Sequence, residues 1–106
     1  MPKYLLQATY NSEGLKGLAK DGASKRRDAV LKATEQVGGR LEAFYYAFGE
    51  TDAYVIVELP DAVTASALSM AVNASGVVQL RTTPLLTVEE VDSAIAKNVG
   101  YRAPGT

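Results

Sequence analysis

The sequence predicts one α+β domain, in which a four-stranded antiparallel sheet carries two helices on one face. Three observations lead to this prediction. Strand-like and helical stretches follow one another in the order strand, helix, strand, strand, helix, strand, and a short terminal helix comes last. Only residues 49–51 separate the second strand from the third, which is typical of a hairpin. The 106 residues, 47% of them hydrophobic, suffice for one core and leave no room for a second domain.

The first third of the chain predicts a strand and an interrupted helix. Residues 3–10 are rich in aromatic and apolar side chains and end at Asn11-Ser12. Apolar residues then recur with helical spacing as far as Gly38-Gly39, with a break at Asp21-Gly22. We expect Ser24 to cap the second piece of this helix. We also expect its basic side chains to face solvent: Lys25, Arg26, Arg27 and Lys32.

Residues 40–48 and 52–59 predict the second and third strands. Pro60 ends the third strand because proline cannot donate a hydrogen bond to a neighbouring strand. Asp61 is placed to cap the helix that follows, and this helix ends at Ser75-Gly76.

The last third predicts a strand, a short helix and a tail. Residues 77–86 form the fourth strand, in which Pro84 indicates an edge position or a bulge. Thr87 and Glu90 have the spacing of a capping box that opens a helix to about Lys97. We assign residues 1–98 to the domain and residues 99–106 to a C-terminal tail. This βαββαβ order is that of the ferredoxin-like fold.

The predicted sheet has more apolar surface than two helices can cover. The strands are apolar on both alternating faces, whereas a sheet with one face in water should alternate with polar residues. A monomer would expose this surface as a large patch. We therefore expect two sheets to pair face to face in a homodimer, or a higher homo-oligomer, of the dimeric α/β-barrel type, with a cavity between the sheets.

The hairpin register decides which side chains face that cavity. We prefer the register that pairs Phe48 with Ala53. Pairing Phe48 one position earlier would set Glu42 against Glu58, and like charges directly opposite one another are unfavourable. The preferred register turns four side chains towards the partner sheet: Tyr45, Tyr54, Ile56 and Glu58.

The composition excludes several classes of chemistry. The chain has no histidine and no cysteine, so disulfides, imidazole bases and zinc sites built on nitrogen or sulfur are excluded. No group of acidic residues has the spacing of a known Mg²⁺ or Ca²⁺ loop, and we expect neither a metal nor another cofactor. The net charge of −1 does not favour a nucleic-acid partner, although residues 1–40 are net basic and residues 41–106 net acidic. No apolar stretch suits a membrane span or a signal peptide, so we expect a cytoplasmic protein.

Eight polar residues are candidates for a ligand site, because each is expected near an otherwise apolar cavity: Gln7, Thr9, Tyr45, Asp52, Tyr54, Glu58, Gln79 and Arg81. We expect Glu58 and Arg81 to meet across the sheet, either as a structural ion pair or as a clamp for a ligand carboxylate. Asp52 lies beside a turn, where an aspartate often accepts hydrogen bonds from backbone N–H groups.

Residues 35–61, with the opening Lys3-Tyr4 strand and the segment from Arg81 to Glu90, resemble the GYD-domain family over about residues 3–97. Gly49 and Asp52 match the triplet that names the family, and Glu50-Thr51 stand between them in place of the tyrosine. The resemblance implies the fold of the dimeric α/β barrels and no established activity.

Three functions remain open. The first is a homodimeric module that binds a small apolar or acidic molecule or serves assembly. The second is a cofactor-free monooxygenase or isomerase, with Glu58, Asp52 or a tyrosine transferring protons. The third, RNA binding, is disfavoured because the aromatic ribonucleoprotein motif is missing from the third strand.

Overall fold

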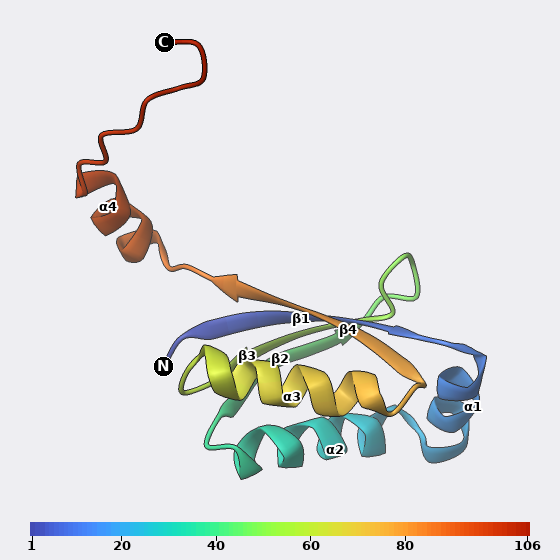
Figure 1. Ribbon diagram of the computed structural model, residues 1–106. Coiled ribbons are helices and arrows are strands. Elements are labelled where there is room, and N and C mark those ends of the chain that lie inside the picture. The colour runs from blue at the N-terminus through green and yellow to red at the C-terminus, as the bar shows by residue number, and fades with distance from the viewer.

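The computed structural model describes residues 1–106 as a four-stranded sheet with helices on one side and a projecting C-terminal arm (Figure 1). The elements in chain order are β1 (Lys3–Tyr10), α1 (Ser12–Asp21), α2 (Ala23–Gln36), β2 (Arg40–Tyr46), β3 (Ala53–Glu58), α3 (Ala62–Ala74), β4 (Val78–Leu85) and α4 (Val88–Ala96). The predicted order of elements is confirmed.

The sheet is antiparallel throughout, with the strand order β2-β3-β1-β4. The helices α2 and α3 lie side by side on one face, and the other face carries no helix (Figure 1). This arrangement confirms the ferredoxin-like α+β fold. Pro84 lies in β4, which is an edge strand, as its lack of an N–H donor requires.

The core lies between the sheet and the two helices. Alternate residues of β1 and β3 are buried and point towards the helices, and the residues between them belong to the opposite face of the sheet. The buried cluster consists of Tyr4, Leu6, Val55, Val57, Leu59, Ala65 and Leu68. The opposite face is called the open face below.

The helix ends follow the sequence signals with one exception. Asn11 caps α1, Asp61 caps α3, and Thr87 with Glu90 forms the predicted capping box of α4. The expectation for Ser24 is wrong. Helix α2 begins directly after Gly22, whose backbone has φ 92°, so that Ser24 lies inside the first turn and no side chain caps the helix.

The predicted hairpin register is shifted by two residues. Tyr46 pairs with Ala53, so that residues 47–52 form the loop, and Phe48 leaves the sheet with φ 56°. A shift of two preserves the faces, because side chains alternate with a period of two. Tyr45 and Tyr54 therefore both lie on the open face, as expected, but Tyr45 lies opposite Tyr54 and not opposite Ile56. A bulge between Leu41 and Ala43 interrupts the pairing of β2 with β3.

The chain leaves the folded body after β4. Figure 1 shows α4 and the last residues extending away from the sheet, and every residue from Leu86 to Thr106 is exposed. No helix of the structure has the length and apolar character needed to cross a membrane.

The start of α1 passes close to the segment before β4, and this approach depends on a glycine. Asn11 accepts a hydrogen bond from Gly14 N–H and donates one to the Gly76 carbonyl oxygen. A Cβ atom on Gly14 would lie 2.3 Å from the Val77 carbonyl oxygen, whereas a Cβ on Gly17 would meet no atom within 4 Å. The two glycines share one helix and differ in the space around them.

We therefore expect Gly14→Ala to lower the free energy of unfolding. To admit the methyl group, α1 and the segment before β4 must move apart. Gly17→Ala should raise it by about 0.5–1 kcal/mol, since alanine is the better helix former. Urea unfolding followed by circular dichroism measures both changes. Equal effects of the two substitutions would contradict the close approach at Gly14.

Candidate functional site

The open face arranges its side chains in rows that run across the four strands. The register places Tyr45, Tyr54, Gln7 and Arg81 in one row. The neighbouring row is mostly apolar and consists of Ala43, Ile56, Leu5 and Thr83. Thr9 and Gln79 form the next pair on the other side of the polar row. Seven of the eight candidate residues therefore lie on the open face, six of them in the polar row and the pair beside it and Glu58 at the far end of β3, whereas Asp52 lies in the loop just before β3.

The two tyrosines of this row are exposed to an unusual degree for side chains in a sheet. Tyr45 is 71% exposed and Tyr54 is 40% exposed, although they lie directly opposite one another on β2 and β3. Their rings provide apolar surface, and their hydroxyl groups provide hydrogen-bonding atoms. This pair can contact either a second sheet or the flat body of a small molecule.

Arg81 is the cation of the row. Its Nη2 atom donates a hydrogen bond to Thr51 Oγ1 at 3.1 Å, and it forms no ion pair with a carboxylate. Thr51 is only 3% exposed and lies in the hairpin loop, next to Asp52. The loop thus orients a guanidinium group whose charge has no counterpart within the chain. Such a group is suited to bind a carboxylate or another anion.

Asp52 has the structural role that its position beside a turn predicts. Its Oδ2 atom accepts a hydrogen bond from the backbone N–H of Tyr10 at 2.8 Å, and its own N–H donates to the Ala8 carbonyl oxygen. Thr9 Oγ1 donates to the Glu50 carbonyl oxygen at 3.3 Å. The hairpin loop is therefore tied to the end of β1, and the carboxylate of Asp52 is occupied by the backbone.

The expected contact between Glu58 and Arg81 is wrong. The Glu58 carboxylate binds Arg40, whose Nε atom donates to Oε2 at 2.7 Å and whose Nη2 atom lies 2.6 Å from the same oxygen. Glu58 pairs with Lys3 on β1, and Lys3 pairs with Leu85 on β4, four residues beyond Arg81. Glu58 and Arg81 are therefore separated along the strands.

The longer hairpin loop and the bulge in β2 are together the reason that the sequence did not reveal this ion pair, because the predicted register sets Ala43 opposite Glu58. An unbroken register would set Leu41 opposite Glu58, whereas the bulge brings Arg40 to that position. Glu42, at the bulge, forms an ion pair with Lys3. Four charges at this end of the sheet thus neutralise one another in two pairs.

The environment of Glu58 favours its charged form. The hydrogen bond from Arg40 lowers the pKa of the Glu58 carboxyl below its usual range, burial opposes this shift, and the charges of Arg40 and Lys3 add to the lowering. The Glu58 side chain is 15% exposed. No three acidic side chains lie close enough together to hold a metal ion.

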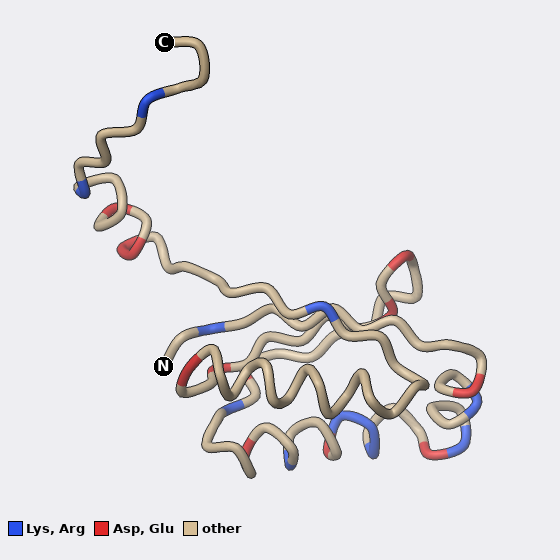
Figure 2. Tube along the Cα trace, viewed as in Figure 1, with Lys and Arg blue, Asp and Glu red and all other residues tan.

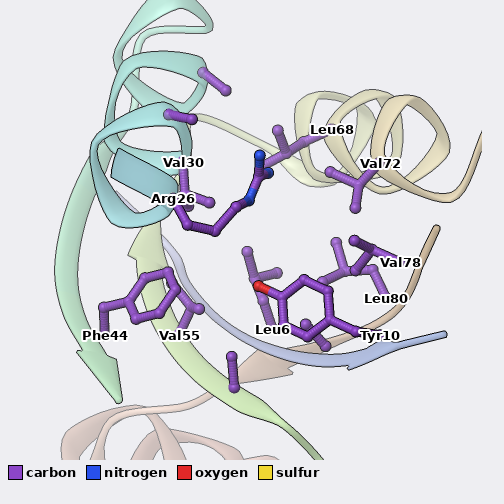
Figure 3. Close-up of a pocket in the computed structure, with 14 residues that line it drawn as sticks. Leu6, Tyr10, Arg26, Val30, Phe44, Val55, Leu68, Val72, Val78 and Leu80 are labelled. Carbon is purple, nitrogen blue, oxygen red and sulfur yellow. The ribbon is translucent and has the colours of Figure 1, made fainter. Parts of the chain in front are cut away.

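A hollow lies on the opposite side of the sheet, between α2 and α3 (Figure 3). Its volume is about 70 Å³, and all but one of its lining residues are apolar or aromatic. The exception is Arg26, which extends from α2 into the gap, and the hydroxyl of Tyr10 points into the same gap (Figure 3). Burial raises the pKa of Tyr10, and the Arg26 charge opposes this rise. The expectation of a fully solvated basic helix face is therefore wrong for Arg26, which is half-buried.

The GYD domain profile matches residues 4–95 of this chain. The chain belongs to the GYD-domain family. The match spans all four strands except the first residue of β1, all three helices of the body and nearly all of α4, which confirms the resemblance seen in the hairpin region. No significant match was found among the curated proteins or among the solved structures. In this GYD domain the Gly49–Asp52 segment forms most of the loop that holds Arg81 through Thr51.

We expect Arg40→Met to raise the pKa of Glu58, measured by titrating the side-chain carboxyl carbon in NMR spectra. Arg81→Met is the matched control and should leave that pKa unchanged. The lowered pKa also sets a sign for stability. Glu58 stabilises the native state at pH values above its unfolded pKa, and this contribution is lost as the pH falls through the lower native value. A pKa of Glu58 that responds to Arg81 and not to Arg40 would contradict the ion pair described here.

Proposed function

We propose that this GYD domain is a homodimer whose two open faces enclose a small molecule with an apolar body and one anionic group. The observation that carries this proposal is the row on the open face in which a guanidinium group without a carboxylate partner lies in line with a glutamine and two exposed tyrosines. The proposal has two parts, the pairing of the sheets and the chemistry of the ligand.

The support for pairing is the uncovered apolar surface. The helices cover one face of the sheet, and the open face presents Leu5, Ala43 and Ile56 beside two exposed tyrosine rings. Apolar patches of this kind on soluble proteins commonly mark interaction sites. A second copy of the same face is self-complementary about a two-fold axis, which is the commonest symmetry of protein dimers.

The support for an anionic ligand is the balance of charge on the open face. Two ion pairs lie at one end of the sheet, Lys3 with Glu42 and Arg40 with Glu58. Arg81 is therefore the charge of this face that has no ion-pair partner. Gln7 lies beside Arg81 in the row and offers both a donor and an acceptor. An aromatic or aliphatic carboxylate would place its charge on Arg81 and its apolar body against the tyrosines.

The pairing of the sheets is tested by sedimentation. The chain has a mass of 11.2 kDa, and the dimer should sediment with twice that mass at micromolar concentration. Ile56→Asp places a charge in the centre of the open face and should give a folded monomer. Val63→Asp, on the exposed side of α3, should remain dimeric. A wild-type monomer, or a dimer that survives Ile56→Asp, would refute pairing through this face.

The ligand chemistry is tested with two fluorescent probes that share an apolar body. Anilinonaphthalene sulfonate carries one negative charge, and N-phenyl-1-naphthylamine carries none. Arg81→Met should weaken binding of the anionic probe about tenfold or more, because a charge-assisted hydrogen bond is lost, and should spare the neutral probe. Arg27→Met, on α2, is the control and should affect neither. Equal loss of both probes, or of neither, would rule out an anion site at Arg81.

A further inference from the structure

The C-terminal arm, residues 86–106, exposes many large apolar side chains for its length. It is exposed throughout and contains six exposed large apolar or aromatic side chains: Leu86, Val88, Val91, Ile95, Val99 and Tyr101. The body of the protein contributes nothing to their burial, because the arm extends away from it (Figure 1).

The helix of the arm is amphipathic. Val88, Val91 and Ile95 recur at intervals of three and four residues, which places them on one side of α4. Glu89 and Glu90 lie on the other side, and Asp92 lies at the edge of the stripe. Figure 2 shows these acidic positions in the projecting helix, apart from the basic residues that gather along α1 and α2. An apolar stripe opposite a charged face is the pattern of a helix that packs against another surface.

The sequence specifies this helix although nothing in the chain supports it. Thr87 Oγ1 accepts a hydrogen bond from Glu90 N–H, and the Glu90 carboxylate accepts one from Thr87 N–H. A capping box of this kind stabilises the first turn. Nine residues are nevertheless too few for a stable isolated helix in water, where about 12–15 residues are already marginal. Helix α4 therefore requires a packing surface that the body does not supply.

The course of the arm shows which side of the domain that surface lies on. The helices α2 and α3 lie on one side of the sheet, and the arm rises from the end of β4 towards the other side (Figure 1). A molecule placed on the open face would therefore lie next to the arm. The family match continues to residue 95, so α4 belongs to the same sequence unit as the sheet.

We propose that α4 of each copy packs its apolar stripe on the second copy, so that two reciprocal arms clasp the dimer formed through the open faces. This inference rests on the pairing proposed above and adds a second interface to it. A two-fold axis makes the contact reciprocal, since each copy then both gives and receives an arm. The arms thereby bury the apolar residues that the body leaves exposed, and they cover the ends of the space between the sheets.

The first experiment compares two double substitutions in the full chain. Val91→Asp with Ile95→Asp places two charges on the stripe, and Ser93→Asp with Ala96→Asp places the same two charges outside it. We expect the first pair to raise the dimer dissociation constant about tenfold or more, and the second pair to change it far less. Urea unfolding checks that the body is intact in both. Equal effects of the two pairs would overturn the proposed contact.

The second experiment shows where the arm lies. Because the chain has no cysteine, Ser93→Cys carries a nitroxide label at one site only. This labelled chain is mixed with an unlabelled, ¹⁵N-enriched copy, and broadening of amide signals in the ¹⁵N copy reports contact between chains. We expect broadening in the wild-type mixture and none when both chains carry Ile56→Asp.

The outcomes separate the two proposals. A dimer in sedimentation without broadening between chains would overturn the arm contact and leave the pairing of the sheets intact. Broadening found only when label and ¹⁵N are on one chain would show that the arm folds back on its own body, and would also overturn the contact. A wild-type monomer at all concentrations would overturn both proposals.

Discussion

The structure depends on one geometric constraint, which is that a sheet has two faces and two helices can cover only one of them. β1 and β3 lie in the centre of the sheet, and their side chains are buried alternately under α2 and α3. The intervening side chains form the open face, where no element of the chain reaches them. The buried face holds the domain together through the cluster around Leu59 and Val57. The open face has no covering layer and is available for contacts with a ligand or a partner.

The ends of the strands show how the open face is ordered. At one end the hairpin loop is fixed by Asp52, whose carboxylate binds the backbone of Tyr10, and the same loop places Thr51 under Arg81. At the other end the bulge in β2 brings Arg40 to Glu58. Both ends consist of polar contacts with fixed geometry, and the apolar row lies between them. The arrangement confines the unpaired charge of the face to a single position.

The comparison of sequence and structure separates local signals from long-range ones. Caps such as Asp61 and Thr87 act within one turn of a helix, so their residue types alone predicted them correctly. The position of Phe48 was predicted wrongly because its left-handed backbone lengthens the loop. Glycine is the residue type that usually indicates such a backbone, and position 48 is not a glycine. The Arg40 ion pair was missed because the longer loop and the bulge both change the register of β2, and the bulge leaves no sequence signal. Arg26 was predicted to face solvent like its basic neighbours. Its place in the hollow depends on how α2 packs beside α3, which the sequence of α2 alone does not show.

The unpaired charge of Arg81 also connects the two parts of the proposed function. In a dimer formed through the open faces, each copy contributes one Arg81 to a space from which the sheets exclude water. Two like charges repel more strongly in such a space than in water, because the effective dielectric constant is lower. This repulsion opposes dimer formation, and an anion bound between the sheets removes it. Ligand binding and dimerisation are then thermodynamically linked, so that each increases the affinity of the other by the same factor. In the proposed dimer the arms would act independently of that charge, because they would bury apolar surface outside the row and contribute to association even when no anion is bound.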